Sequence, residues 1–383
     1  MTNKIISKVF FVLVLLFSLF GVPPKIHVLN RVDFIDFLTD NNLELKIFSI
    51  LLILLFILFN SKFKNQLKAI NELKPWLFFF VFKLFILLKY FFQIQSTFGL
   101  YEITIFISLL YVYAYLSYTL NYKDFLMVIN LTAWIFIILN IIQYVYDYSA
   151  LFISNRFISL TGNSNHAAVI FSIFSIFSLI GLQINYLKFS NYMLLIICLP
   201  LLIITGSKTG LFVIGLYIIL YFLKDFKMIG IFTLIIIPAY YLFNSFDSLE
   251  IVGSFERISN FQDTRSANWN LSLQNFYESP FIGSSSNNER LTFIESSYLA
   301  CLENYGIIGF SLFLISIMLL IRKIYMKKFI LSVYFALALL FGGLFEAYLL
   351  SSTNLVLHTL LIITVLNINQ NNINENFSRN ILH

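Results

Sequence analysis

Apolar runs of membrane-spanning length repeat along the chain and limit its fold more than any other feature. A helix that crosses a hydrocarbon core of roughly 30 Å needs about 20 mostly apolar residues, and we find about twelve such runs. Because lipid offers the backbone no hydrogen-bond partner, and the runs lack the alternation of a barrel, we expect helices. The expected spans are residues 6–22, 44–60, 75–93, 99–120, 125–146, 166–184, 191–206, 208–223, 228–244, 297–321, 329–350 and 352–367.

The predicted fold is therefore all-α, a single polytopic membrane domain over residues 1–383 with one large outer loop at about 245–295. Hydrophobic residues make up 59% of the chain and charged residues 11%, whereas soluble domains carry about 25% charged residues. No small-residue cleavage site follows the first run, and further spans come after it. We therefore expect a retained helix and not a secretory signal.

Lysine positions predict the orientation of the chain in its membrane. An N-terminus in the cytoplasm places nearly all the lysines between spans on the inner side, as the positive-inside rule requires. The C-terminus is then also cytoplasmic. The net charge of +6 follows from this topology, so we expect no nucleic-acid partner.

Arginine is distributed differently from lysine. Five of the seven arginines fall on the predicted outer side, against the positive-inside rule. A guanidinium grips phosphate or carboxylate with two parallel hydrogen bonds, which lysine cannot do. The alternative is that the outer loops carry a few solvated arginines. The outer residues are Arg31, Arg156, Arg257, Arg265 and Arg290.

The first outer segment is RFISLTGNSNHAAVI, in which Arg156 precedes a turn that opens a helix. We expect Ser164 or Asn165 to cap that helix, and its free backbone N–H groups make a candidate anion site beside Asn163. Every helix that enters a membrane needs a cap, so a purely structural role stays open. His166 is likewise a candidate cleft residue or a capping residue.

The second outer segment, TGSKTG, joins two spans by a turn so tight that Lys208 must lie at the membrane surface. Pro200 and Pro238 fall in the outer halves of neighbouring predicted spans. Proline kinks a helix and frees backbone carbonyls, which in a membrane is tolerated where protein or water covers the break. We expect an outward-facing, water-filled cleft, with ordinary kinks as the alternative.

The third outer segment is the large loop. Arg265, Trp269, Leu273 and Phe276 recur at helical spacing and share one face, with Asp263 or Thr264 as the expected cap. An arginine at the first turn of a helix that faces the protein is well placed to bind phosphate. Glu295 then leads into the next span, where either a catalytic or a helix-capping role is possible.

Ionisable residues also fall inside the predicted spans, where each costs at least about 2.5 kcal/mol near the bilayer centre. Lys89, Glu303 and Glu346 lie near the outer surface and are expected to snorkel or to line the cleft. Lys83 lies deepest, and either a neighbouring carboxylate or a lipid phosphate could neutralise it.

The chain lacks the short motifs of nucleotide, dinucleotide and zinc chemistry. Cys198 and Cys301 fall in or beside predicted helices and are interpreted as packing residues. We expect no cofactor and no metal.

From Arg156 to Phe310 the order of these motifs resembles the O-antigen polymerase and ligase superfamily of bacterial envelope glycosyltransferases. The resemblance rests on the Arg-to-Gly-Asn segment, the GSKT turn, the outer loop with Arg and Trp, and the sequence ESSYLACLENYGIIGF, which contributes Tyr298. Such proteins transfer a glycan from undecaprenyl diphosphate, outside the inner membrane, using neither metal nor nucleotide. The resemblance implies that Lys208 stands where the family often has arginine and that Arg265 is the diphosphate-binding loop arginine.

Glu295 stands where ligases usually carry histidine, which favours a polymerase that extends a lipid-linked repeat unit. Arg156, Lys208, Arg257 and Arg265 would stabilise the charge of the departing diphosphate, and Glu295 would take the acceptor proton. The expected partners are undecaprenyl-diphosphate-linked oligosaccharides as donor and acceptor, and membrane lipid. The resemblance also leaves room for a chain-length regulator.

Two alternatives stay open. An O-antigen ligase would transfer the glycan to lipid A core. A glycolipid flippase would gather its polar residues at the bilayer midplane and show internal repeats, neither of which we find. The sugars and their linkage do not follow from the sequence.

Overall fold

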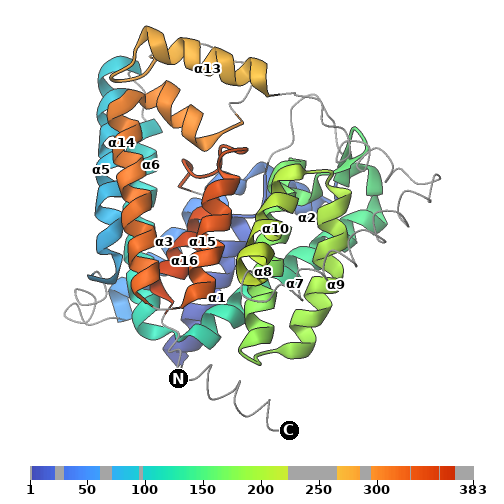
Figure 1. Ribbon diagram of the computed structural model, residues 1–383. Coiled ribbons are helices and arrows are strands. Elements are labelled where there is room, and N and C mark those ends of the chain that lie inside the picture. The colour runs from blue at the N-terminus through green and yellow to red at the C-terminus, as the bar shows by residue number, and fades with distance from the viewer. Residues whose placement is uncertain are drawn as a thin grey trace.

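The computed structural model describes residues 2–21, 30–60, 71–94, 98–222, 265–284, 295–327, 329–352 and 354–366. This part of the chain is mostly helical (Figure 1). The α-helices are α1 Thr2–Phe17, α2 Asp33–Asp40, α3 Asn42–Asn60, α5 Leu77–Lys89, α6 Phe98–Thr119, α7 Tyr122–Tyr146, α8 Ser164–Gln183, α9 Lys188–Ile204, α10 Lys208–Phe222, α13 Ser266–Glu278, α14 Ser297–Met326, α15 Ile330–Gly342 and α16 Leu355–Val365. The shorter elements are η1 Asn71–Trp76, η2 Tyr90–Ile94, η3 Tyr148–Leu151, η4 Ser159–Thr161 and the strands β1 Phe152–Ile153 and β2 Arg156–Phe157.

Six helical stretches within the described residues are long and apolar enough to cross a membrane. Their outward faces carry large apolar side chains, such as Phe59 and Phe92, which are 85% and 74% exposed. Water would disfavour such a surface, whereas lipid would not. The protein is therefore a helical membrane protein. The six stretches are Asn42–Phe59, Leu73–Phe92, Gly99–Thr119, Tyr122–Tyr146, Ser164–Gln183 and Ser297–Met326.

The helices form two groups that meet at α8 and α16 (Figure 1). Helices α5, α6 and α14 pack on one side, and α8, α9 and α10 pack on the other. Every residue of α16 is buried, as are most residues of α8. Helix α13 lies across one end of the bundle, at the top of Figure 1, and packs on α14.

The predicted spans 329–350 and 352–367 are not continuous helices. Helix α15 has 13 residues and ends at Gly342, and α16 has 11 residues and begins at Leu355. At 1.5 Å per residue they are roughly 20 and 16 Å long, short of the roughly 30 Å core. The connection 343–354, non-helical over its described residues, holds three leucines, one phenylalanine and one tyrosine, so hydropathy alone cannot distinguish it from a helix. The predicted span 228–244 lies outside the described residues.

Polar side chains hold the connection 343–354 inside the protein. The Ser297 hydroxyl, at the start of α14, donates to the Glu346 carbonyl at 2.6 Å and accepts from the Leu349 N–H at 3.1 Å. Non-helical backbone at membrane depth is tolerated where protein satisfies its hydrogen bonds. The start of α14 supplies such bonds here.

A buried ion pair between Lys83 and Glu102 fixes the far end of the same connection. A neighbouring carboxylate therefore neutralises Lys83, which was one of the two alternatives left open by the sequence. The Lys83 ammonium lies 2.5 Å from Glu102 Oε2 and donates to the Leu350 carbonyl at 2.7 Å. The same carboxylate oxygen accepts from the Ser352 hydroxyl at 2.7 Å. The pair therefore links α5 and α6 to the connection 343–354.

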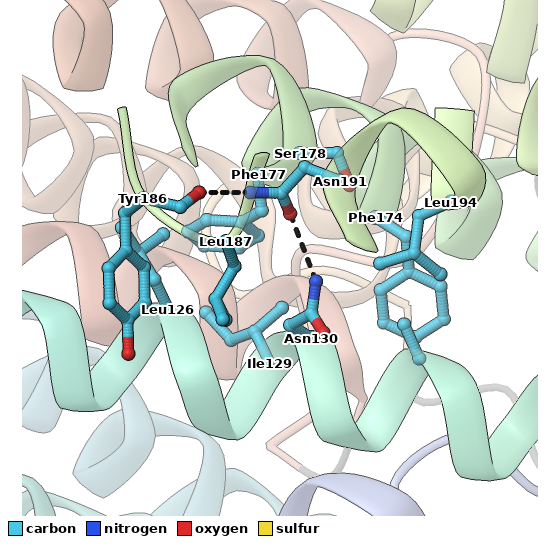
Figure 2. Close-up of a pocket in the computed structure, with 11 residues that line it drawn as sticks. Leu126, Ile129, Asn130, Phe174, Phe177, Ser178, Tyr186, Leu187, Asn191 and Leu194 are labelled. Atoms are coloured by element: carbon cyan, nitrogen blue, oxygen red, sulfur yellow. Dashed lines mark hydrogen bonds between the residues drawn. The ribbon is translucent and has the colours of Figure 1, made fainter. Parts of the chain in front are cut away.

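At the opposite end of the bundle, α1 is fastened to the start of α7. Lys4 and Lys8 each lie 2.6 Å from a carboxylate oxygen of Asp124. Nearby, a polar network joins α7 to α9 around a cavity of about 10 Å³ (Figure 2). The Asn130 amide donates to Asn191 Oδ1 at 3.0 Å, and Asn191 donates to the Tyr186 carbonyl at 2.7 Å. These amides hold α9 in register inside an otherwise apolar interface.

Helix α14 is broken at Gly306, whose φ and ψ are 59° and −168°. Backbone of this kind is essentially restricted to glycine. The chain that follows α13 fills the break, because the Ile307 N–H donates to the Pro280 carbonyl at 2.8 Å. Lys89 adds bonds to the carbonyls of Ile282 and Ser284 at 3.0 and 2.8 Å, and a further bond to Asn304. These contacts fix α13 over the bundle.

Candidate active site

A two-residue hairpin presents Arg156. Ser154 and Asn155 have φ of 50° and 57°, the geometry of a type I′ turn, and Ile153 pairs with Arg156 across it. The all-α prediction did not include this hairpin. Asparagine tolerates positive φ better than most residues, and this tolerance is the local reason for the turn.

Arg156 binds two neighbouring segments with its guanidinium. Its Nε donates to the Thr205 carbonyl at 3.0 Å, and its Nη2 donates to Asn165 Oδ1 at 2.9 Å. The cap of α8 is Asn163, whose side chain accepts from the N–H groups of Asn165 and His166. The prediction of Ser164 or Asn165 as cap is therefore wrong, and Asn165 is instead free to bridge Arg156 to another group.

Arg265 immediately precedes α13 and lies against two carboxylates. Its Nε lies 2.6 Å from Glu295 Oε2, and its Nη2 lies 3.6 Å from Glu346 Oε1. The guanidinium also stacks 5.6 Å above the ring of Phe345. The predicted caps Asp263 and Thr264 lie outside the described residues.

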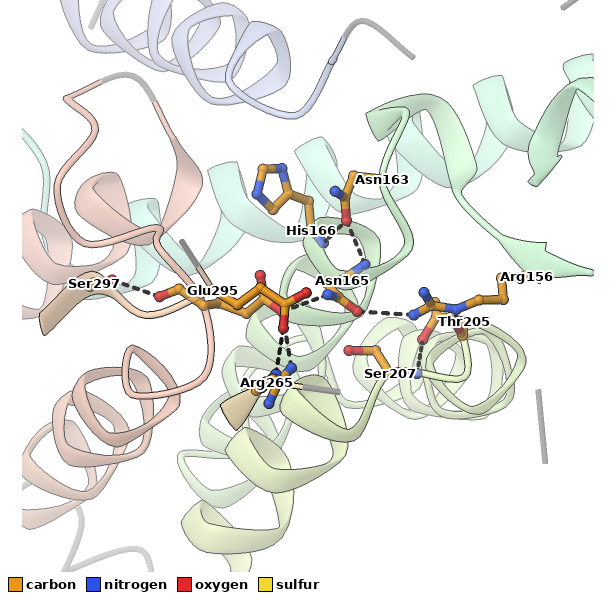
Figure 3. Close-up of polar contacts among 10 residues, drawn as sticks. Arg156, Asn163, Asn165, His166, Thr205, Ser207, Arg265, Glu295 and Ser297 are labelled. Atoms are coloured by element: carbon orange, nitrogen blue, oxygen red, sulfur yellow. Dashed lines mark hydrogen bonds and ion pairs between the residues drawn. The ribbon is translucent and has the colours of Figure 1, made fainter. Parts of the chain in front are cut away.

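Glu346 joins the two arginines into one cluster. The Asn165 amide donates to Glu346 Oε1 at 2.6 Å, so Arg156, Asn165, Glu346 and Arg265 form a continuous chain of polar contacts. Figure 3 shows Arg156, Asn165 and Arg265 converging from separate segments, with Glu295 paired to Arg265. We call Arg156, Asn165, Arg265, Glu295 and Glu346 the arginine cluster.

Burial sets the protonation of Glu346. The carboxylate lies in the connection 343–354, outside the helices, and is 7% exposed. Desolvation raises its pKa to about 7, although the charge of Arg265 opposes the shift. A carboxyl group with such a pKa can exchange a proton near neutral pH.

A cavity of about 520 Å³ borders the arginine cluster. Its wall includes Asn163 and His166, which flank Asn165, and Ala347 and Tyr348, which follow Glu346. The ends of α1 and α3 close the other side. A hollow of this size is in the usual range of small-molecule sites. Of the predicted cleft residues, Asn163 and His166 line this cavity.

Lys208 and Trp269 lie beside the cluster. Lys208 begins α10 with an exposed side chain, three residues after the Thr205 carbonyl that Arg156 binds. Trp269 lies on the face of α13 that carries Arg265, and its indole N–H is buried without a hydrogen-bond partner among the described residues. The hydroxyl of Ser207 is also buried without a hydrogen-bond partner among the described residues. The region therefore holds two buried donors that could bind a ligand.

Two predicted cleft residues serve packing instead. The Tyr298 hydroxyl donates to the Leu340 carbonyl at 2.9 Å, and its ring contacts Phe313 edge-on. Glu303 is 1% exposed and accepts from the Asn275 amide at 2.8 Å, which ties α13 to α14. Neither residue lines the cavity beside the arginine cluster. Arg257 and Arg290 lie outside the described residues.

Lys46 and Glu102 are polar residues that the sequence reasoning missed. Lys46 lines the cavity from α3, one helical turn after Asn42, which lines it too. A charged residue four positions after an amide, within an otherwise apolar run, is a signal that could have marked one polar face. Within the described residues, no three His, Cys, Asp or Glu side chains are grouped to hold a metal ion.

Comparisons with protein-family models and with curated proteins find no match to this chain.

Proposed function

We propose that this protein is a glycan polymerase of the bacterial inner membrane, with both termini in the cytoplasm. It would transfer a growing glycan from undecaprenyl diphosphate to a lipid-linked repeat unit on the outer face. The observation that supports this proposal most is the arginine cluster. Two guanidinium groups from distant segments are joined through Asn165 and Glu346 beside a cavity of about 520 Å³.

The chemistry suits two prepositioned cations. In the transfer, the acceptor hydroxyl oxygen bonds to C1 of the donor sugar, the bond from C1 to the diphosphate oxygen breaks, and the diphosphate leaves with its electron pair. Arg265 and Arg156 would stabilise the negative charge on that leaving group, and Lys208 would add a third cation. Because this charge is largest late in the reaction, they would bind the transition state more tightly than the substrate.

The proton of the acceptor hydroxyl must pass to a base, and two carboxylates of the cluster are candidates. Glu295 is the choice that the sequence predicts. Its Oε2 lies 2.6 Å from Arg265 Nε, so it also positions that guanidinium. Glu346 has its pKa raised to about 7 and is the better matched proton acceptor at neutral pH. We propose Glu346 as the base, with Glu295 holding Arg265.

Deletion of the gene tests the reaction class. A polymerase deletion leaves a single capped repeat unit, whereas a ligase deletion accumulates long polymer on its carrier. A flippase deletion leaves repeat units on the cytoplasmic side. Complementation with the wild-type gene should restore the ladder of chain lengths, and complementation with Arg265→Gln should not. A normal ladder in the deletion strain would overturn the proposal.

A further inference from the structure

The cavity beside the arginine cluster is lined by a lysine side chain that has no role in the proposed reaction. Lys46 lines it from α3, and no acidic residue is among those that line it. Across the described residues, the Lys46 ammonium has neither a hydrogen-bond nor an ion-pair partner. An ammonium in the outer part of a membrane helix costs free energy unless a counter-charge or water reaches it. The cavity is therefore suited to a ligand that brings a negative charge.

The hydrogen-bonding groups of the same wall favour a ligand rich in hydroxyls. Asn42 donates its amide to the Thr39 carbonyl at 2.7 Å, while its own carbonyl oxygen is an acceptor with no described partner. Asn163 has the reverse arrangement, because its side-chain oxygen caps α8 and its side-chain nitrogen Nδ2 has no described partner. A hydroxyl both donates and accepts, so it can use both kinds of group.

His166 and two aromatic rings complete the wall. The His166 imidazole lines the cavity, and Figure 3 shows it turned away from Arg156. Phe20 and Tyr348 add flat apolar surface on other sides. Polar edges and apolar faces in one hollow match a sugar ring, which has hydroxyls at its rim and C–H groups on its faces.

We propose that this cavity binds a sugar ring with an anionic substituent, a carboxylate or a phosphate, and that Lys46 is its counter-ion. The inference rests on the proposed function, because the cavity shares its Asn163–His166 wall with the arginine cluster. It goes further by naming the substrate class: the sugar next to the reacting bond is acidic. Lys46 therefore selects the repeat unit and takes no part in bond breaking.

Binding of three monosaccharides to the purified full-length protein in lipid nanodiscs tests this assignment. Glucose, glucuronate and glucose 6-phosphate share a ring and differ in charge, and ligand-observed NMR measures their affinities without catalysis. We expect one or both charged sugars to bind about tenfold more tightly than glucose, or about 1.4 kcal/mol. Which one does so distinguishes a carboxylate from a phosphate substituent.

Variants of Lys46 separate charge recognition from misfolding. Lys46→Gln should abolish the preference for the charged sugar and leave glucose binding unchanged, whereas Lys46→Arg should keep the preference. Lys188→Gln is the matched control, because Lys188 is exposed at the start of α9 and lies outside the cavity. Equal binding of glucose and both charged sugars, or a preference that survives Lys46→Gln, would overturn the proposal.

This experiment can fail separately from the proposed function. Arg265→Gln should leave the sugar preference intact, because Arg265 does not line the cavity. Charge-selective binding in a protein that polymerises nothing would refute the polymerase alone. A chain-length ladder that depends on Arg265, without charge-selective binding, would refute the acidic-sugar site alone.

Discussion

Replacing Glu102 by Gln removes the carboxylate that neutralises Lys83 in the helix bundle. The side chains of Lys83 and Glu102 are 1% and 7% exposed, and the ion-pair distance is 2.5 Å. Glutamine keeps the shape and one acceptor oxygen but leaves the ammonium without a counter-charge. The same carboxylate binds Ser352, so the change also releases the end of the connection 343–354.

Removing one partner of a buried ion pair costs about 3–5 kcal/mol. Since each 1.4 kcal/mol is a factor of ten, a loss of about 3 kcal/mol raises the ratio of undocked to docked connection roughly 100-fold relative to the wild type. Undocking would carry Glu346 away from Arg265 and Asn165. Glu102→Gln should therefore lower polymer formation although Glu102 does not contact the arginine cluster.

A cysteine introduced at Leu349 reports undocking, because Leu349 is 4% exposed in the docked connection. The native Cys198 and Cys301 are both buried, so an impermeant maleimide should label them slowly. We expect Glu102→Gln to raise the labelling rate of Leu349→Cys by roughly 100-fold. Thr104→Val is the control on the same helix, since the Thr104 hydroxyl bonds only the Leu100 carbonyl, at 2.7 Å, among described contacts.

The double variant Lys83→Met with Glu102→Met distinguishes a buried-charge effect from loss of docking. Replacing both ions by apolar groups is often nearly neutral for stability. Its thermal unfolding temperature and its labelling rate should therefore both return toward the wild-type values, whereas labelling that stays fast would mean that docking depends on the lost hydrogen bonds. Labelling of Leu349→Cys at the same rate with and without Glu102→Gln would refute this reasoning.

Three further predictions concern the cluster and the helix break. Because the pKa of Glu346 is raised to about 7, its carboxylate is protonated below and ionised above that pH. The kcat/KM of polymerisation should thus rise roughly tenfold from about pH 6 to 8, and Glu346→Gln should abolish this rise. If the rise with pH persists in Glu346→Gln and is lost in Glu295→Gln, Glu295 is the base. Arg265→Lys loses the planar fork and should lower the initial rate by roughly 10²-fold, whereas a rate near wild type would remove Arg265 from the mechanism. Gly306→Ala places a Cβ 2.3 Å from the Phe281 carbonyl at a φ of 59° and should cost at least about 1–3 kcal/mol in denaturant unfolding. The control Gly215→Ala, inside α10 with nothing within 4 Å of its Cβ, should cause no destabilisation, because alanine is the better helix former.

Much of the helical architecture could be predicted from hydropathy. The runs at 44–60, 99–120 and 125–146 correspond closely to α3, α6 and α7, because a long apolar stretch has few alternatives to a helix. The prediction was wrong for the second half of 329–350, which is not helical, and the run 352–367 contains the shorter helix α16. Hydropathy measures how apolar the side chains of a segment are and gives no information on its backbone hydrogen bonds.

The candidate site was predicted in part. The arginine excess on the predicted outer side marked Arg156 and Arg265, and the capping pattern marked the start of α8. The sequence did not reveal that Asn165 and Glu346 connect the two arginines, because those residues are far apart along the chain. Tyr298 and Glu303 belonged to the same motif but pack against α15 and α13.

The sequence by itself determined that this chain belongs in a membrane, since this follows from the free energy of transfer of its long apolar runs into lipid. Only the tertiary structure decided which charges meet. Ion pairs such as Lys83 with Glu102, and the contact of Asn165 with Glu346, depend on distances of a few ångströms between helices. Those distances are set by helix packing and by the break at Gly306, which no local pattern encodes.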